Sequence, residues 1–394
     1  MPCIVQKFGG TSVATLSRIK NVAEIIAKSR NVHHGNIVAV VSAMAGVTNK
    51  FIECANDLNA FEGDPEYDAV VSSGELVTSG LLAIALKNVG IESRSYASWQ
   101  VPVFSNGNHG CAEITHVNPE NLLRDLENGI VPVVCGFQGI APSNQVTTFG
   151  RGGSDLTAVA VSAAIKANLC EIYSDVDGVY TTDPNVYAHA KRVERLSYRE
   201  MLEMSSQGAK VLQEQSVAYA MKKDVVVRVV SSFVDSGGTI VSSESSGAPF
   251  CGVAVAHNIS QITVSYRNNG NFNDLHNFLE NNNVNAEISL SEEGFNANVM
   301  VSKNQTASAI QILTQLSFVT NVKQEIARQH LSRISIIGAS VDEKVRKDLE
   351  KELKKHNICL FGCLSKEYRA NIVVSSNQLL SAISILHKYC GLDK

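Results

Sequence analysis

The sequence lacks any apolar run long enough to cross a lipid bilayer. Its longest such runs, Gly80–Leu86 and Ala158–Ile165, fall far short of the roughly 20 residues that a membrane helix needs. Lysine and arginine form no stripe with interleaved aromatic residues, and the net charge is −4, so nucleic acid is not an expected partner. No cationic stretch followed by a long apolar one occurs near residue 1, and we expect neither secretion nor a membrane anchor.

The nine cysteines are scattered along the chain and include no C-x-x-C pair. Cys359 and Cys363 lie closest together, in a segment whose pattern predicts a strand. An odd, dispersed set of thiols is typical of a protein in a reducing cytoplasm, rather than of a disulfide framework or a zinc site. We therefore expect a cytoplasmic protein.

Proline and glycine are distributed unevenly. All eight prolines lie at or before Pro249, and only six of the 27 glycines follow it. A chain of 394 residues, 44% of them hydrophobic and 18% charged, is long enough for two or three domains. We predict one domain over residues 1–247 and two smaller ones over residues 258–327 and 328–394, the last completed by a strand at 250–257.

The first part of the chain alternates buried strands with amphipathic helices. Val38–Ser42, Val131–Gly136 and Cys170–Tyr173 are typical of buried strands, and Leu16–Ile26 places its apolar residues on one helical face. Such strands, separated by helices, favour a mostly parallel sheet covered on both faces. We therefore predict a three-layer α/β/α domain, in which ligands bind beyond the carboxyl ends of the strands.

The chain after residue 258 predicts two similar units. The first runs from a strand at Gln261–Tyr266 to a strand near Val319–Ile326, in the βαββαβ order of a ferredoxin-like fold. The second, from a strand at Arg333–Gly338 to a helix at Leu379–Tyr389, ends one strand short. A spare strand at Cys251–Ala256 could complete it, so that the two units would interleave.

The stretch KFGGTS, residues 7–12, places a lysine at a predicted strand end just before two glycines. Glycines let backbone N–H groups approach phosphate oxygens closely, and the helix that follows adds the positive end of its dipole. The pattern is neither GxxxxGK[ST] nor GxGxxG. Alone, it fits an ordinary strand-to-helix turn equally well.

The stretch FGRGGSD, residues 149–155, precedes an apolar helix predicted over Leu156–Ala167. Arg151 is suited to a planar carboxylate or phosphate. The two glycines after it expose backbone donors, and the serine or aspartate that follows can cap the helix. A glycine-rich hairpin would explain the cap but not the arginine, so the pattern favours a binding site.

Four weaker patterns accompany these two. SAMAGVT, residues 42–48, puts small residues and hydroxyls after a buried strand, and the carboxylate of SSGE, residues 72–75, either complements a helix dipole or binds an ammonium group. YSDVDGVYTTDPN, residues 173–185, could hold ribose and adenine; its spacing is not that of a calcium loop. Lys210 in GAKVL adds a cation, although a lone lysine is more often a solvated surface residue.

Taken together and in order, these stretches resemble the amino acid kinase superfamily and, within it, the aspartokinases. The matching segments are KFGGTS, SAMAGVT, SSGE, FGRGGSDLTAVA, YSDVDGVYTTDP and GAKVL, and the similarity covers essentially the whole chain. The C-terminal βαββαβ pair then resembles the two ACT domains of that family. These domains bind amino-acid effectors such as lysine or threonine and mediate dimer formation, which implies a homodimer or a higher homo-oligomer.

The resemblance implies transfer of the γ-phosphoryl group of ATP to the side-chain carboxylate of L-aspartate. The products are 4-phospho-L-aspartate and ADP, in the first step of lysine, threonine and methionine synthesis. A carboxylate is already a nucleophile at neutral pH, and no histidine occupies any motif, so no general base is expected. Charge neutralisation and in-line positioning should supply most of the catalysis. Mg²⁺ is expected with ATP, held largely by phosphates and waters.

The resemblance also implies a role for each site residue. Lys7 and the Gly9 and Gly10 amides would hold the transferring phosphates with help from Lys210, and Asp155 would orient Lys7. Aspartate would be bound by Ser42, Thr48, Glu75, Arg151, Gly152, Gly153 and Ser154. Of these, Glu75 would meet its ammonium group and Arg151 its α-carboxylate. The nucleotide pocket would be lined by Ser174, Asp175, Tyr180 and Asp183.

The sequence departs from the family pattern in three places. Gln213-Glu214-Gln215 stands where the family usually continues His-Pro-Arg, and Asn185 stands where arginine is common. Each change removes a cation near the expected nucleotide and predicts weaker ATP binding. The Pro-Gly turn that often opens an ACT helix is also missing, which leaves feedback inhibition by lysine or threonine open.

Two alternatives remain open on the sequence. A related kinase could act on glutamate, N-acetylglutamate, carbamate or UMP, although the arginine and the carboxylate suit a free α-amino acid and the ACT pair argues against these relatives. A non-catalytic amino-acid sensor with a kinase-like fold would fit the altered segment at residues 213–215.

Overall fold

The structure is a computed structural model and describes residues 3–33, 35–209, 211–235, 237–245, 247–267, 272–282, 284, 286–290, 295–324 and 330–393. The chain forms two compact units. The first consists of Met1–Val179, Arg192–Ser206 and Lys210–Gly247. The second consists of Tyr180–Lys191, Gln207–Ala209 and Ala248–Lys394. The C-terminal part of the chain therefore shares its unit with a short loop, residues 180–191. The three predicted domain limits remain predictions.

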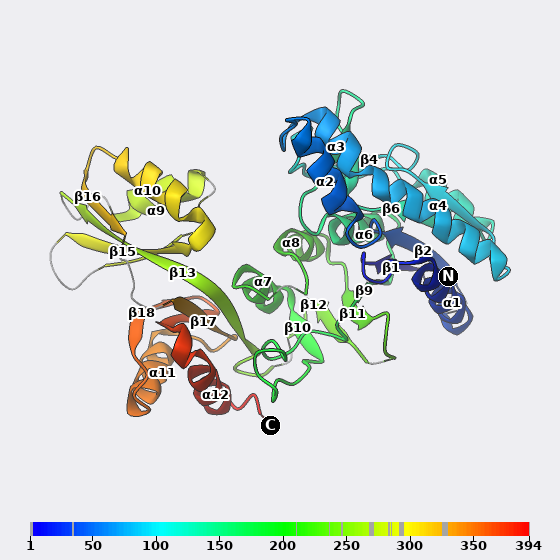
Figure 1. Cartoon of the computed structure of the whole chain (residues 1–394). Helices are drawn as coiled ribbons and strands as arrows, with labels where there is room; N and C mark the ends of the chain where they lie inside the picture. The colour runs from blue at the N-terminus through cyan, green and yellow to red at the C-terminus, as the bar shows by residue number, and fades with distance from the viewer. Residues whose placement is uncertain are drawn as a thin grey trace. The chain divides into compact units, whose positions relative to one another are not determined.

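An eight-stranded sheet forms the centre of the first unit, in the order β10-β12-β11-β9-β1-β2-β6-β3 (Figure 1). Neighbouring strands pair in parallel except for β11 and β12, which confirms the predicted mostly parallel sheet. The strands are β1 (Cys3–Phe8), β2 (Asn36–Val41), β3 (Ser93–Tyr96), β6 (Val131–Cys135), β9 (Leu169–Ser174), β10 (Arg195–Ser197), β11 (Val227–Ser231) and β12 (Thr239–Ser242).

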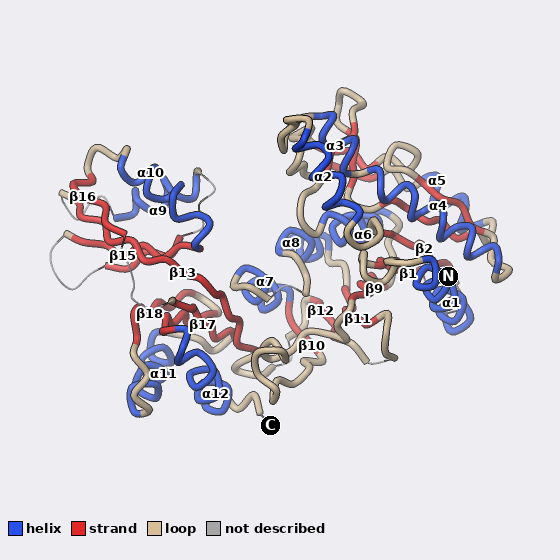
Figure 2. The backbone as a smooth tube through the Cα atoms, in the orientation of Figure 1, coloured by secondary structure: helices blue, strands red, loops and turns tan. Residues whose placement is uncertain are grey.

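Helices cover both faces of this sheet, as predicted (Figure 2). α1 (Leu16–His33) and α4 (Ser73–Asn88) pack on the face that buries Phe8. Because successive side chains of a strand point to opposite faces, the neighbouring Lys7 points to the other face, where α6 (Gly153–Ala164) packs with α8 (Glu214–Lys223). Further helices of the unit are α2 (Val47–Asp57), α3 (Pro65–Val71), α5 (Glu120–Glu127) and α7 (Tyr198–Ser206).

The segment Pro65–Asn88, which contains α3 and α4, is long and apolar enough to cross a membrane by length and composition alone. Polar residues interrupt it, so no continuous apolar run marks it in the sequence. Half of its most apolar window is buried inside the protein, and α4 packs against α1, β3 and β6. This burial is typical of a core helix, so the segment is weak evidence for a membrane span.

A second, four-stranded sheet lies in the first unit, where the sequence analysis predicted no strands. Its order is β5-β4-β7-β8. Each strand has three or four residues, too few for an alternating pattern to stand out. The strands are β4 (Val103–Ser105), β5 (Ile114–Val117), β7 (Gln138–Ile140) and β8 (Val146–Thr148).

The carboxylate of Asp68 joins α3 to this small sheet. Asp68 is fully buried. Its oxygens accept hydrogen bonds from the backbone N–H groups of Gly110 and Thr148 and from the Thr148 hydroxyl, at 2.6 to 3.2 Å. His109 Nδ1 lies 3.0 Å away. A buried carboxylate with this many donors fixes the sheet against the helix.

A seven-stranded sheet runs through the second unit, in the order β14-β15-β13-β17-β19-β18, with β16 also beside β13. The sequence analysis expected two separate strands between residues 251 and 266, whereas the structure joins them into one strand, β13 (Gly252–Tyr266). Its register shifts at Asn258, which adopts a left-handed φ of 57° that asparagine tolerates. The other strands are β14 (Ala286–Leu290), β15 (Asn296–Ser302), β16 (Val319–Gln324), β17 (Leu331–Ile337), β18 (Leu360–Lys366) and β19 (Arg369–Ser375).

Strand β13 serves both halves of the second unit (Figure 1). Its first part pairs with β17, and its last part pairs with β15 and β16. α9 (Phe272–Asn281) and α10 (Thr306–Thr314) share a hydrophobic core with one half, and α11 (Glu343–Lys355) and α12 (Leu379–Tyr389) with the other. The two predicted ferredoxin-like units are therefore confirmed, with one long strand common to both.

Replacing Asp68 by alanine should destabilise the first unit by about 3 kcal/mol, because it leaves several buried donors without an acceptor. Trp99 is the only tryptophan and lies in this unit, so urea unfolding followed by its fluorescence reports on the first unit. Asp57→Ala, at an exposed position of α2, is the matched control and should change stability by less than about 0.5 kcal/mol. Equal effects of the two changes would contradict the role of Asp68.

Candidate active site

The predicted site begins at the carboxyl ends of the central strands of the first unit. Lys7 is the next-to-last residue of β1, in register with Val40 of β2 and Ile172 of β9. Ser42 follows β2 directly. Because parallel strands end at the same edge of a sheet, the loops after β1 and β2 meet there, as expected for a ligand site of this fold.

Two glycines let the loops at this edge approach one another. A Cβ at Gly10 would lie 3.0 Å from the carbonyl oxygen of Ala43, and one at Gly74 would lie 2.7 Å from the Ala43 Cβ. Neither position has room for a side chain. The start of α4 therefore packs directly on the loop after β2, and this brings Glu75 to the backbone of Ala43.

Lys7 and Asp155 form an ion pair beneath the loop after β1. The distance from Lys7 Nζ to Asp155 Oδ1 is 2.5 Å, and the two side chains are only 11% and 9% exposed. Asp155 lies in the first turn of α6. The pair has the geometry that the predicted orienting role of Asp155 requires.

Glu75 is a buried carboxylate with one unused oxygen. Its side chain is almost fully buried; Oε1 accepts a hydrogen bond of 2.9 Å from the Ala43 N–H, while Oε2 has no hydrogen-bond partner among the described residues. Burial raises the pKa of Glu75 from 4.5 to about 7, although the Ala43 N–H opposes part of the rise. Such an oxygen is a ready acceptor for a cationic donor, such as an ammonium group.

The glycine-rich turn before α6 exposes Arg151. Gly150 and Gly152 have left-handed φ values of 69° and 73°, which glycine adopts without strain. The structure corrects one expectation here: Gly152 is the N-cap of α6, with no side-chain capping bond, so neither the serine nor the aspartate of this turn caps the helix. Arg151 is exposed and, within the described ranges, makes no hydrogen bond or ion pair.

A cavity of about 780 Å³ brings most of the predicted site residues together. This volume suits a small-molecule ligand. The predicted residues that line it are Lys7, Gly10, Ser42, Thr48, Glu75, Arg151, Gly152, Gly153, Ser154 and Asp155. The cavity also has lining residues that the sequence analysis missed, among them Asn49, Phe137 and Thr148. Phe137 and Thr148 come from short loops and strands with no recognisable motif, so only the fold could identify them.

The remaining predicted residues do not line this cavity. The Gly9 N–H donates to the Tyr173 carbonyl at 3.2 Å, and binding of phosphate by this amide stays a prediction. The Ser174 hydroxyl donates to Asp175 at 2.9 Å. Tyr180 and Asp183 belong to the second unit, and Lys210 lies outside the described residues.

Gln213, one of the departures from the family pattern, lies beside the glycine-rich turn. A Cβ at Gly152 would overlap the Gln213 side chain. Gln213 is also the N-cap residue of α8. The neutral glutamine at position 213, where the family usually has histidine, therefore changes the surroundings of Gly152, which lines the cavity.

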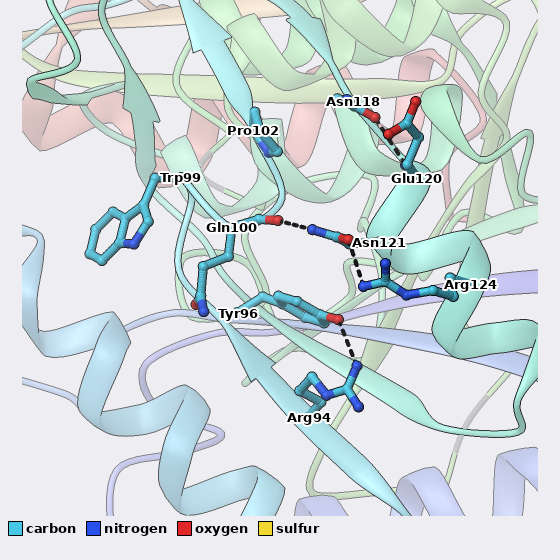
Figure 3. A pocket seen from close by; sticks show the side chains of 9 residues that line it. All are labelled: Arg94, Tyr96, Trp99, Gln100, Pro102, Asn118, Glu120, Asn121 and Arg124. Atoms are coloured by element: carbon cyan, nitrogen blue, oxygen red, sulfur yellow. Dashed lines mark hydrogen bonds between the residues drawn. The ribbon is translucent and has the colours of Figure 1, made fainter.

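A second cavity, of about 420 Å³, lies by β3 and α5 (Figure 3). Its polar side chains bond mainly to one another. Arg94 donates to the Tyr96 hydroxyl at 3.3 Å, Arg124 donates to Asn121 at 2.7 Å, and Asn121 donates to the Gln100 carbonyl at 2.6 Å (Figure 3). It contains no predicted site residue, and we place the active site in the larger cavity.

Comparisons with known proteins identify the family of this chain. Residues 2–231 match the model of the amino acid kinase family, and the chain belongs to that family. The chain is similar to aspartokinases over its whole length. An aspartate kinase of Stutzerimonas stutzeri and an aspartokinase of Pseudomonas aeruginosa are each 36% identical, with 100% of this chain and 98% of the relative covered. The family resemblance seen in the sequence is thus confirmed.

Solved structures show the same relationship. The structure is similar to E. coli aspartokinase III in complex with aspartate and ADP, with a TM-score of 0.80 and 25% identity, covering 98% of this chain and 99% of that one. A second structure of E. coli aspartokinase III, with lysine and aspartate, has the same fold, with a TM-score of 0.76 and 24% identity. Both matches span the first unit and the ferredoxin-like part.

The raised pKa of Glu75 predicts a pH-dependent stability in the absence of ligand. The folded protein binds the Glu75 proton more tightly than the unfolded chain does, so this residue lowers stability as the pH rises from 4.5 to about 7. Glu75→Gln keeps the acceptor for Ala43 but does not ionise. Across this window, its stability relative to the natural protein should rise by up to about 1.4 kcal/mol per pH unit, measured by urea unfolding and Trp99 fluorescence. A pH-independent difference would show that Glu75 has an ordinary pKa.

Proposed function

We propose that this chain transfers the γ-phosphoryl group of ATP to the side-chain carboxylate of L-aspartate. The observation that carries the proposal is that one cavity contains two groups without a hydrogen-bond partner among the described residues, Oε2 of Glu75 and the guanidinium of Arg151. These two groups complement the ammonium and α-carboxylate of a free amino acid. The full-length similarity to aspartokinases supports aspartate as that amino acid.

The proposed substrate contacts follow from the two charged groups. Glu75 would accept hydrogen bonds from the ammonium group, and Arg151 would bind the α-carboxylate through paired donors. The other predicted substrate contacts along the cavity are Ser42, Thr48, Gly152, Gly153 and Ser154. Because the reacting carboxylate is already ionised at neutral pH, these groups need only orient it, and no side chain has to remove a proton.

Lys7 would neutralise charge on the transferring phosphoryl group. Its ion pair with Asp155 fixes the ammonium group before substrates bind, so little reorganisation is needed during transfer. Gly10 would offer its backbone to the phosphates, and Lys210 would assist. Asp155 acts through Lys7 and is a positioning residue rather than a base.

The nucleotide would be held by Ser174, Asp175, Tyr180 and Asp183, in the roles that the family resemblance implies. Among the described residues, no group of three His, Cys, Asp or Glu side chains could hold a metal ion. We therefore expect an Mg²⁺ ion to arrive bound to the phosphates of ATP and to keep its waters. Such an ion would neutralise phosphate charge when ATP is bound.

The wider setting of the reaction rests on the same resemblance. We infer that the reaction begins lysine, threonine and methionine synthesis in the cytoplasm, and that the ferredoxin-like units act as ACT domains. They would form a homodimer or a larger homo-oligomer and could bind lysine or threonine as effector. The presence of an intact set of substrate-side residues favours an active kinase over a non-catalytic sensor.

Lys7→Ala and Asp155→Asn should each lower kcat by about 100-fold or more, because each removes part of a fixed electrostatic group. Lys20→Ala, at an exposed position of α1, is the control and should leave kcat unchanged. The assay measures aspartate-dependent ADP release with Mg-ATP, and Trp99 fluorescence confirms that each variant is folded. Full activity in both variants would refute the assigned roles, and a folded natural protein without turnover would favour the sensor.

Arg151→Ala should raise KM for aspartate by about 30-fold or more with little change in KM for ATP, since it removes a charge-assisted contact to the α-carboxylate. Arg151→Lys keeps the charge but not the paired donors, so an intermediate KM is expected. A panel of aspartate, glutamate and N-acetylated amino acids would check the substrate class. Equal turnover of N-acetylated substrates would contradict the proposed contact between Glu75 and an ammonium group.

A further inference from the structure

Three side chains of the second unit form a chain of hydrogen bonds, buried at Thr181 and His387 and partly exposed at Asp393. The Thr181 hydroxyl oxygen lies 2.8 Å from His387 Nε2, and His387 Nδ1 is hydrogen-bonded to Asp393. His387 is fully buried, and Thr181 is nearly so. The proposed reaction gives no role to any of these side chains.

The end of α12 is shaped so that Asp393 can reach His387. Gly391 has a left-handed φ of 68° and ends the helix. The Gly391 N–H donates to the Lys388 carbonyl at 3.1 Å, and the Leu392 N–H donates to the His387 carbonyl at 3.0 Å. This pair of bonds is a Schellman motif, which turns the chain back over the last helical turn. The carboxylate of Asp393 therefore lies next to the ring of His387.

Thr181 closes the loop formed by residues 180–191 and joins it to the sheet. Its N–H donates to the Lys191 carbonyl at 2.7 Å, and the Lys191 N–H donates to the Thr181 hydroxyl at 2.9 Å. The Thr181 carbonyl accepts a bond of 2.6 Å from the Val253 N–H at the start of β13. Both the backbone and the side chain of Thr181 are thus fixed.

The donors and acceptors determine where the protons lie in this chain of bonds. An ionised Asp393 can only accept, so His387 Nδ1 carries a proton and donates it. With a single proton on Nδ1, Nε2 is an acceptor, and the Thr181 hydroxyl can donate to it while accepting from the Lys191 N–H. Each group is satisfied, and removal of one side chain would leave a buried partner unpaired.

Apolar contacts hold the same loop against α12. The rings of Tyr187 and His387 have centroids 4.9 Å apart, and Val186 and Tyr187 pack against the hydrophobic core that contains Leu386 of α12. The carbonyl of Asp183 accepts from the N–H groups of Val186 and Tyr187 at 2.9 Å. The conformation around Asp183 therefore depends on a segment that is itself packed on the C-terminal helix.

We propose that His387 is a positioning residue for nucleotide binding. Thr181 directly follows Tyr180 and precedes Asp183 by two residues, and both of these are proposed to contact ATP. By holding Thr181, the imidazole of His387 fixes the loop in the conformation that presents them. The inference rests on the proposed function, because it assumes that this loop contacts the nucleotide. The end of the C-terminal helix α12 would thus influence ATP affinity although it does not contact ATP.

Thr181→Val and His387→Phe test the proposal, since each removes the hydrogen bond between the two side chains and nearly preserves volume; Thr181→Val also removes the side-chain acceptor of the Lys191 N–H. Each should raise KM for ATP by about fivefold to tenfold, the effect of one buried hydrogen bond, while KM for aspartate stays within about twofold. The double variant should be no worse than the more affected single variant, because the two side chains act as a pair. Thr181→Ser, which keeps the hydroxyl, should restore the natural KM for ATP.

Asp342→Ala is the matched control for general damage to the second unit. Asp342 caps α11 by accepting from the Val345 N–H at 2.8 Å, so its loss weakens the unit without changing residues 180–191. It should leave KM for ATP unchanged. The proposal is overturned if Thr181→Val and His387→Phe leave KM for ATP unchanged, or if Asp342→Ala raises KM for ATP as much as they do.

Calorimetry with ADP separates this proposal from the proposed function. If the natural protein shows no aspartate-dependent turnover, the proposed function fails, but a fivefold weaker ADP affinity in folded Thr181→Val would still support the positioning role. If His387→Phe does not fold, Asp393→Asn takes its place, with a smaller change in ADP affinity expected. An ADP affinity that is the same in the natural protein and in folded Thr181→Val overturns the proposal.

Discussion

The ion pair between Lys7 and Asp155 is the interaction on which the arrangement of the site depends. Lys7 lies in a central strand whose neighbours in register are Val40 and Ile172, and a buried ammonium group in such surroundings needs a close anionic partner. Asp155 supplies it from the first turn of α6. That helix can begin there because the glycines before it adopt left-handed conformations. The same turn therefore exposes Arg151 and positions Asp155 for its ion pair with Lys7.

Glu75 and Arg151 differ from this pair because neither has a charged partner among the described residues. Within the described ranges, Oε2 of the buried Glu75 has no hydrogen-bond partner, and Arg151 makes no hydrogen bond or ion pair. A pKa of about 7 leaves Glu75 only partly ionised near neutral pH. An ammonium group placed beside it would favour the ionised form. A zwitterionic substrate would then pair its ammonium group with Glu75 and its α-carboxylate with Arg151. In this proposal, Lys7, held in place by Asp155, neutralises the phosphoryl group, whereas Glu75 and Arg151 bind the amino-acid substrate.

Sequence patterns identified long regular elements well and short or distant features poorly. The helix at Leu379–Tyr389 has the predicted bounds, because its apolar period extends over three turns. The small sheet was missed because its strands are too short to show a period, and Asp68 was missed because its partners Gly110 and Thr148 lie 42 and 80 positions away in the chain. The loop motifs located Lys7, Glu75 and Arg151, but only the structure shows that the Gly9 amide is already bonded. The contact between Thr181 and His387 spans 206 positions, and no local pattern encodes it.

The departures from the family pattern acquire a more specific meaning from their positions. Gln213 was expected to remove a cation near the nucleotide, yet its side chain packs on Gly152, next to Arg151 in the chain. A cation at position 213 would lie close to this turn and would repel the guanidinium or compete with it for a carboxylate. A neutral glutamine leaves the recognition of the α-carboxylate to Arg151. The substitution therefore bears on substrate recognition as well as on ATP affinity, and kinetic constants for both substrates are needed to separate the two effects.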